Sequence, residues 1–273
     1  EHDVEVSSIF TDEMFEDLRG LCESRGISGF EEIKRDMWLA GDLRLGKRRI
    51  VTEFLKDPDL GAKRLISMPD RVTNTINTVA ATATGRAPLP ACRPCVINNY
   101  EGDLSSKEAW WSQWKKFMFE DKVRICTKLG CTEQAPVEML EPIPRSKYPA
   151  ITADEERLAI PLQLLCQAIF DAVIVHFMNS LSSDGTWQVI KSRIIESLYK
   201  GKHALTMKIL ADVYAEVDII CLQEVAGVFK STFQASTLAE THEVIEPMAL
   251  DGKRDQNSLL VLRKDVFPSP GIK

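Results

Sequence analysis

Residues 1–65 carry three runs of apolar residues at helical spacing, separated by glycine, proline and charged residues. Thr11 precedes the first run and Gly26 follows it, as the start and stop signals of a helix do. The apolar members of the three runs are Met14, Phe15, Leu18, Leu21 and Cys22; Phe30, Ile33, Met37 and Trp38; and Ile50, Val51, Phe54 and Leu55. We therefore expect a helical N-terminal region over 1–65. Residues 66–92 are rich in Thr, Asn, Ala and Pro, which predicts a linker or an extended segment.

A stripe of aromatic residues at helical spacing follows in 105–120. Ser105 and Glu108 have the spacing of a capping box, which predicts a helix start directly before the stripe. The stripe is formed by Trp110, Trp111, Trp114, Phe117 and Met118, and its three tryptophans are the candidate interaction residues. A helix that packs these indoles against a core is the favoured interpretation. The alternative is a binding face, for stacked bases or for a protein partner.

The most apolar stretch of the chain is 158–178, behind a second predicted capping box at 152–155. It has the length of a membrane span. However, Gln163, Gln167 and Asp171 recur every four residues on one face of the predicted helix, where lipid would not accommodate them without a partner. We expect a buried helix of a soluble protein, with an assembly interface as the alternative. His176 on the same helix is expected to be a core or boundary residue rather than a ligand.

Short apolar strands replace helices near the C-terminus. Two more helices are predicted over 186–200 and 203–215, and strands over 217–222, 242–245 and 258–262. The run 217–222 is expected to be a buried strand, because it is apolar throughout. The pattern predicts an α/β protein, with a helix-rich N-terminal part and an incomplete sheet.

Composition and charge narrow the classes of function. The 273 residues are 44% hydrophobic and 27% charged, which excludes a disordered chain. A net charge of -6 argues against a protein that coats nucleic acid non-specifically. It leaves open an enzyme that contacts one phosphodiester, because a bound metal supplies a local positive field. The short basic run 47–49 is typical of a solvated helix face, with phosphate or partner binding as the alternative.

The seven cysteines are an odd number without a regular framework, which indicates reduced thiols and an intracellular protein. Cys92, Cys95, Cys126 and Cys131 could form a zinc site, but their spacing is loose, and buried or inert thiols are favoured. The acidic start at 1–5 is unlike a secretory signal. We expect the cytosol, or the interior of an organelle after removal of a presequence.

The strongest chemical signal is the segment 217–225, in which an apolar run ends in Gln223 and Glu224. Ligands bind beyond the carboxyl ends of strands in open α/β sheets, and a carboxylate there is a suitable ligand for Mg²⁺. The segment closely resembles a strand of the endonuclease/exonuclease/phosphatase superfamily, which has the deoxyribonuclease-I-like fold. The resemblance implies that Glu224 is a metal-binding carboxylate and that Gln223 braces it.

The segment 95–102 is similar to the first strand of that family, which ends in an asparagine. This implies Asn99, with Asn98 beside it, as the metal- or phosphate-site residue, supported by Glu101. Two asparagines that turn a loop are the alternative. The resemblance places a partial domain over 93–273, with a helical insertion at about 105–200. The segment 255–257 has the letters of the family's later Asp-x-Asn motif, but it precedes a strand, and no terminal Asp-His pair occurs.

Together these patterns predict a metal-dependent phosphoesterase or nuclease-like domain that is inactive as this chain. Its expected cofactor is Mg²⁺ and its expected substrate a phosphoester. The alternative is a non-catalytic structural or interaction subunit of a larger assembly, with partners on helices 105–120 and 158–178. An enzyme should keep Glu224 open and near Asn98 or Asn99, whereas a scaffold should bury Glu224 or pair it with a cation.

Overall fold

The computed structural model describes most of the chain, and two hydrophobic cores organise it. The described residues are 2–41, 43–63, 65, 78–80, 89–90, 102–127, 130–182, 184–195, 202–226, 229–248 and 257–268. Of residues 78–80, 89–90, 123–127, 130–132, 195 and 202–203 only the backbone is described.

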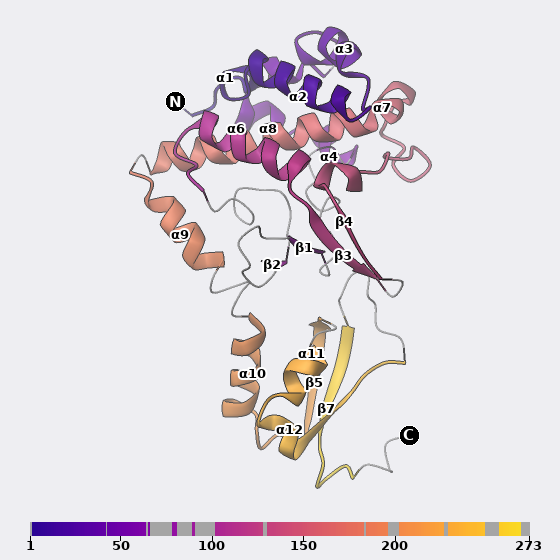
Figure 1. The fold of residues 1–273 in the computed structure, drawn as a ribbon, viewed down its shortest axis with the longest axis vertical. Coiled ribbons are helices and arrows are strands. Elements are labelled where there is room, and N and C mark those ends of the chain that lie inside the picture. The colour runs from indigo at the N-terminus through magenta and orange to yellow at the C-terminus, as the bar shows by residue number, and fades with distance from the viewer. Residues whose placement is uncertain are drawn as a thin grey trace.

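The first core belongs to a helical body at the N-terminal end (Figure 1). Its helices are α1 (Val6–Ile9), α2 (Asp12–Ser24), α3 (Phe30–Ile33), α4 (Pro58–Ala62), α6 (Lys107–Lys115), α7 (Ala153–Arg157), α8 (Ala159–Leu181) and α9 (Thr186–Ile195). Short π-helical segments occur at η1 (Lys34–Trp38), η3 (Ile50–Phe54) and η4 (Lys116–Glu120). Short 3₁₀-helical segments occur at η2 (Leu45–Lys47) and η5 (Pro136–Met139). The helical region predicted over 1–65 is therefore present, but in shorter segments than the periodicity indicates.

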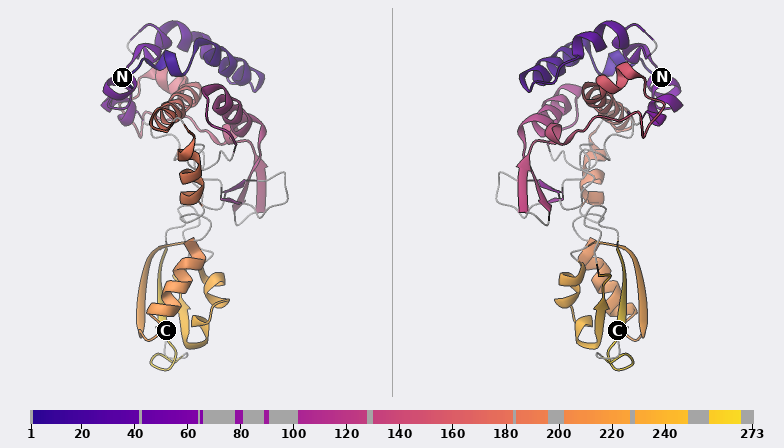
Figure 2. Two further views of the ribbon diagram at one scale, coloured as in Figure 1. Left: turned by 90° about the vertical axis from the view of Figure 1, so that its left-hand side faces the viewer. Right: turned by 90° about the vertical axis from the view of Figure 1, so that its right-hand side faces the viewer.

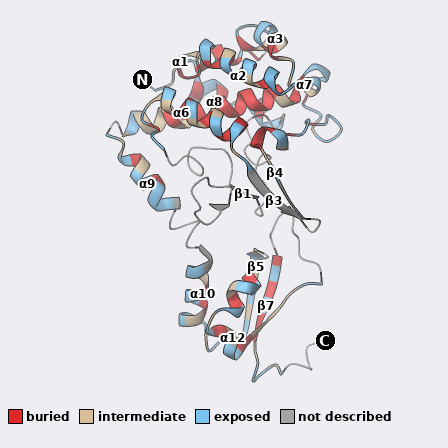
Figure 3. Ribbon diagram, in the orientation of Figure 1, coloured by how far each residue is buried: buried red, intermediate tan, exposed pale blue. Residues whose placement is uncertain are grey.

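Helix α8 is the centre of this body, with α1, α2 and α6 packed against it (Figure 3). Among the described helices it is the one long and apolar enough to cross a membrane by length and composition, and 72% of its most apolar window is buried inside the protein. The polar stripe of Gln163, Gln167 and Asp171 is buried as well. The prediction of a buried helix at 158–178 is confirmed.

Gln167 offers a test of how this polar stripe affects stability. Neither atom of its side-chain amide has a hydrogen-bond partner in the part of the chain that the structure describes. Because an unsatisfied buried polar group destabilises a protein by about 1–3 kcal/mol, Gln167→Met should raise the free energy of unfolding by a similar amount. Urea denaturation, monitored by tryptophan fluorescence, measures this change in the free energy of unfolding. Gln163→Met is the control and should give a smaller gain, because only Gln163 Oε1 lacks a partner there, whereas Nε2 donates to the Glu141 carbonyl at 2.9 Å.

The N-terminus of α6 differs in detail from the predicted capping box. The cap is Ser106, whose hydroxyl accepts a hydrogen bond from the Ala109 N–H at 3.1 Å, so the box expected between Ser105 and Glu108 is wrong by one residue. A lone N-cap hydroxyl suffices to start this helix. The second predicted box is confirmed, since Thr152 and Glu155 bond each other's backbone N–H groups at 3.2 and 2.9 Å.

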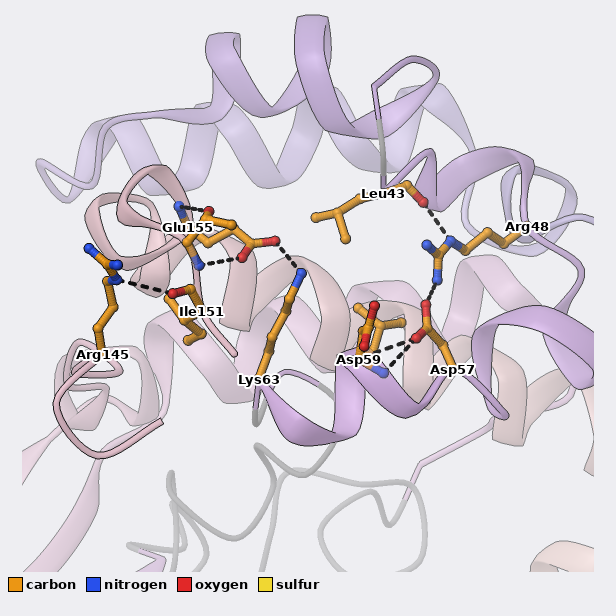
Figure 4. A network of polar contacts seen from close by, with 10 residues as sticks. Leu43, Arg48, Asp57, Asp59, Lys63, Arg145, Ile151 and Glu155 are labelled. Atoms are coloured by element: carbon orange, nitrogen blue, oxygen red, sulfur yellow. Dashed lines mark hydrogen bonds and ion pairs between the residues drawn. The ribbon is translucent and has the colours of Figure 1, made fainter. Parts of the chain in front are cut away.

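Glu155 also ties α7 to the distant end of α4. Its other carboxylate oxygen lies 2.8 Å from Lys63 Nζ, and the two side chains are only 5% and 12% exposed (Figure 4). One buried carboxylate thus caps α7 and neutralises a buried ammonium group.

The first core crosses the domain boundaries predicted from the sequence. It contains residues from 6–65 and from 104–187 in one cluster, for example Phe10, Trp38, Trp111 and Leu165. Trp111 contacts Phe10 edge to face, with ring centroids 5.3 Å apart. The predicted separation of a region 1–65 from an insertion at 105–200 therefore differs from the observed packing. The reason is that each segment has only one amphipathic face, and the two faces bury each other.

A small antiparallel sheet of order β2-β1-β3-β4 adjoins the helical body. Its strands are β1 (Thr78–Ala80), β2 (Leu89–Pro90), β3 (Val123–Thr127) and β4 (Gly130–Gln134). The first two fall in the predicted linker or extended segment 66–92. The β3–β4 hairpin falls in the insertion predicted to be helical, a correction explained by β-branched residues in 123–132, which favour strands.

The second core belongs to a small unit of sheet and helices near the C-terminal end. It comprises α10 (Lys202–Val213), β5 (Ile219–Val225), α11 (Phe229–Gln234), α12 (Leu238–Thr241), β6 (His242–Ile245) and β7 (Asn257–Arg263). Figure 2 shows these elements gathered apart from α1 and α2. The sheet has the order β5-β7-β6 and is antiparallel. The helix at 203–215 and all three strands predicted here are present, so the mixed α/β character is confirmed.

The environment of β5 differs from the prediction of a buried strand. Among the described strands it lies at the edge of its sheet, and its side chains alternate between half-buried and exposed up to Gln223. Ile220 and Leu222 face the core formed with Phe229 and Phe233. Ile219, on the other face, is 50% exposed, because the described helices of this unit cover only one side of the sheet.

Candidate functional site

Glu224 lies at the carboxyl end of β5, at an irregularity of the sheet. Leu222 pairs with Leu259 and Val225 pairs with Asn257, so β5 advances three residues while β7 advances two. The extra residue forms a β-bulge, and Glu224 adopts the left-handed conformation with φ 53°. Its side chain is exposed and forms no hydrogen bond or ion pair with the described residues. Bulges are frequent next to active sites, where they change the direction of a side chain.

Asn257 holds the bulge in place. It begins β7, is buried, and donates a hydrogen bond from Nδ2 to the Val225 carbonyl at 3.1 Å. The sequence shows this residue only as part of Asp-Gln-Asn before a strand. Its function as a clamp on β5 depends on the strand register, which no local motif reveals.

Substitutions at Glu224 test the strain in this bulge. The left-handed conformation destabilises a residue with a Cβ by about 1–2 kcal/mol, and a β-branched residue is still less favourable there. We expect Glu224→Gly to be at least as stable as the parent chain and about 1–2 kcal/mol more stable than Glu224→Val. Hydrogen exchange of the β5 and β7 amides measures this unit directly. Equal protection in the Gly and Val variants would contradict the strained bulge.

The other ligands implied by the resemblance cannot be placed beside Glu224. Asn98, Asn99 and Glu101 lie outside the described residues. Gln223 is on β5 next to Glu224 and is exposed. Within the described ranges, no group of three or more His, Cys, Asp or Glu side chains could hold a metal ion.

The cysteines of the predicted zinc site are only partly described. Cys92 and Cys95 lie outside the described residues, whereas Cys126 and Cys131 are directly opposite each other in the backbone register of β3 and β4. Two of the remaining cysteines, Cys22 and Cys166, are buried, and burial raises the pKa of each thiol to about 12. These two thiols are unreactive at neutral pH, because only the thiolate is nucleophilic.

The aromatic stripe of α6, predicted as an interaction surface, is buried in the first core. Trp110, Trp111 and Trp114 are all buried, and the Trp111 and Trp114 rings stack with centroids 5.1 Å apart. The assignment of these indoles to a partner-binding face is therefore wrong, and the core interpretation is confirmed. Helices α6 and α8, proposed as partner sites at 105–120 and 158–178, bury their apolar faces within the chain. Large exposed apolar side chains occur instead on α9, α10 and β5.

Chemically, the described site is one open carboxylate held at a fixed point of a sheet. Mg²⁺ fits such a position in part, because it keeps several waters and is commonly bound by one or two carboxylates. The absence of a salt bridge to Glu224 among the described residues leaves both oxygens accessible to a cation.

Comparison with known proteins gives one match. A family model described as a domain of unknown function, DUF8234, matches residues 3–192. No curated protein and no solved structure matches the chain. The matched residues include the helical body from α1 to most of α9, and end before α10 and β5. Because the model covers more than half of the 273 residues, the chain belongs to the DUF8234 family.

Proposed function

We propose that the chain contains part of a metal-dependent phosphoesterase domain, in which Glu224 is a ligand of Mg²⁺. The observation that carries this proposal is the placement of Glu224, which is exposed and unpaired among the described residues, at the bulged carboxyl end of β5. The sequence around it resembles the metal-binding strand of the endonuclease/exonuclease/phosphatase superfamily. Asn98, Asn99 and Glu101 remain proposed contributors, with Gln223 as a brace.

Each residue has a separate task in this proposal. The Glu224 carboxylate binds the metal, and Asn257 fixes the bulge in which Glu224 lies, through its hydrogen bond to the Val225 carbonyl. When bound, Mg²⁺ would stabilise negative charge on the phosphoryl oxygens of a phosphoester. The sequence has no consecutive Asp-His motif to activate water, so we propose that these 273 residues bind the metal without turnover.

Metal binding and turnover can be measured separately. Mn²⁺, as a paramagnetic substitute for Mg²⁺, should bind the purified chain, and Glu224→Gln should weaken that binding at least tenfold, because a neutral amide replaces a charged ligand. Glu240→Gln is the matched control, since Glu240 is also an exposed carboxylate of the same unit. Equal Mn²⁺ affinity of Glu224→Gln and the parent chain would refute the metal site.

A hydrolysis assay tests the second half of the proposal. The chain should not cleave bis(p-nitrophenyl) phosphate in the presence of Mg²⁺. Turnover that Glu224→Ala abolishes would show an active enzyme and contradict the expected inactivity, while it would strengthen the assignment of Glu224.

The alternative is a non-catalytic interaction subunit, and a specific observation favours it. Helix α10 exposes Leu205, Ile209 and Val213, which recur every four residues and form a stripe facing away from the second core. Exposed apolar patches of this kind mark protein interaction sites. If the stripe mediates self-association, light scattering should detect a dimer that Ile209→Glu dissociates, and a parent chain that stays monomeric would contradict it.

A further inference from the structure

A basic hollow lies in the segment 43–58, far in the sequence from Glu224. The cavity has a volume of about 510 Å³, and its lining includes Arg44, Lys47, Arg48 and Lys56. The lining residues come from η2 and the residues that flank it, from η3, from the loop before α4 and from its first residue, so one short segment forms the whole cavity. Two carboxylates, Glu53 and Asp57, also line it. The hollow thus has four cations and two anions, in a chain whose net charge is -6.

Both carboxylates are already engaged by other groups. Asp57 is ion-paired with the Arg48 guanidinium (Figure 4) and also accepts hydrogen bonds from the Asp59 and Leu60 N–H groups at 2.7 and 3.3 Å. Burial by itself would raise the pKa of Asp57, but these bonds outweigh it and hold the pKa below its ordinary value. Glu53 accepts a hydrogen bond from the Arg49 backbone N–H at 2.6 Å.

The remaining cations form no ion pair within the described part of the chain, although the Glu53 carboxylate lines the same hollow. Arg44, Lys47 and Lys56 are exposed and form no ion pair or hydrogen bond through their side chains there. Arg48 differs, because Asp57 and the Leu43 carbonyl fix its guanidinium. The hollow is therefore lined by one fixed guanidinium and by three cations without an ion-pair partner among the described residues.

Arg44 also has a strained backbone. Its φ of 38° and ψ of 47° lie in the left-handed region, which is uncommon for a residue other than glycine. Strain of this kind persists where the surrounding structure imposes it, and it is concentrated at ligand-binding sites. Here it places an arginine at the cavity, where a glycine would fit the backbone better.

We propose that this hollow binds a small molecule that carries a diphosphate group. Two adjoining phosphates present several oxygens to Arg44, Lys47 and Lys56, and charge-assisted hydrogen bonds to such oxygens are strong. A concave site of this volume has the size of a small-molecule pocket. An extended polyanion such as nucleic acid fits less well, because the acidic chain as a whole repels it.

Calorimetric titration of the full chain with inorganic pyrophosphate tests the proposal. Each lost charge-assisted bond corresponds to about a tenfold weaker affinity, so Arg44→Gln/Lys47→Gln/Lys56→Gln should weaken binding more than a hundredfold. The matched control removes the same charges elsewhere, in Lys147→Gln/Arg193→Gln/Lys208→Gln, and should leave the affinity within a factor of about three. Equal losses in the two triple variants would overturn the site.

Arg44→Gly separates binding from folding. This variant removes one cation but relieves the left-handed backbone, so it should weaken pyrophosphate binding about tenfold without lowering Tm. Undiminished binding by Arg44→Gly contradicts the proposal. So does a single-stranded oligonucleotide that binds the parent chain more tightly than pyrophosphate does, because it would identify nucleic acid as the ligand.

Discussion

Replacement of Lys63 by methionine should lower the free energy of unfolding by about 3–5 kcal/mol, because removal of one partner leaves a buried charge uncompensated. The charge left behind is the Glu155 carboxylate, which is 5% exposed and lies 2.8 Å from Lys63 Nζ in the parent chain. Urea denaturation followed by tryptophan fluorescence is the appropriate measurement. All five tryptophans lie in the helical body, so this signal reports on the body that contains the ion pair.

The double variant Lys63→Met/Glu155→Gln should recover most of that loss. A glutamine at position 155 removes the unpaired charge and still accepts the hydrogen bond from the Thr152 N–H, because glutamine also forms capping boxes. Lys34→Met is the control for a surface ion pair, since the Lys34 and Glu16 side chains are 51% and 36% exposed, and it should change stability little. A Lys63→Met variant as stable as Lys34→Met would contradict the importance of the buried pair.

Truncation of Trp114 to alanine should also destabilise the helical body by about 3–5 kcal/mol. Its indole is fully buried, stacks on Trp111, and lies 6.4 Å from the Phe119 ring between centroids. The cavity left behind cannot be filled by neighbours that are themselves held in the core. Urea denaturation followed by circular dichroism measures the effect without relying on the removed fluorophore.

Val189→Ala is the control for Trp114→Ala, because Val189 is an exposed apolar residue of α9. It should change the free energy of unfolding by no more than about 0.5 kcal/mol. If Trp114→Ala had an equally small effect, the indole would contribute to a surface and not to the core.

Features set by neighbouring residues could be predicted from the sequence. The capping box at 152–155, the buried helix α8 and the three strands of the second unit depend on local spacing, and each occurs where the pattern places it. Local spacing does not predict the features that long-range contacts determine. The sequence does not show that β5 is an edge strand, because an apolar run of this length looks the same at the edge and in the middle of a sheet.

The basic run 47–49 is a second example in which the local sequence does not predict how side chains are arranged at a candidate site. Three consecutive cations appear equivalent in the sequence, but Arg48 pairs with Asp57 and Arg49 bonds the Asp3 carbonyl. Lys47 alone of the three remains for a ligand, and it is joined by Arg44 and Lys56. Neither of these is part of the run. Their grouping depends on the turn at η2 and on the position of η3.

Glu224 combines one feature that the local sequence predicts with one that depends on long-range contacts. Its position at the end of a strand could be predicted, because the polar pair after an apolar run is a local signal. The bulge could not, since it arises from a mismatch in register between β5 and β7. Asn257, which stabilises the bulge, is 32 residues from its partner Val225 in the chain.

The single core formed by two distant stretches of sequence has a consequence for how the protein is made. Trp111 bonds Asp17 across 94 positions, and Lys63 bonds Glu155 across 92. Contacts between such distant positions form only after long loops have closed. During synthesis, we therefore expect the apolar faces of α1 and α2 that contact α8 to stay exposed until α8 has left the ribosome. This nascent chain is the stage at which we expect it to depend most on chaperones.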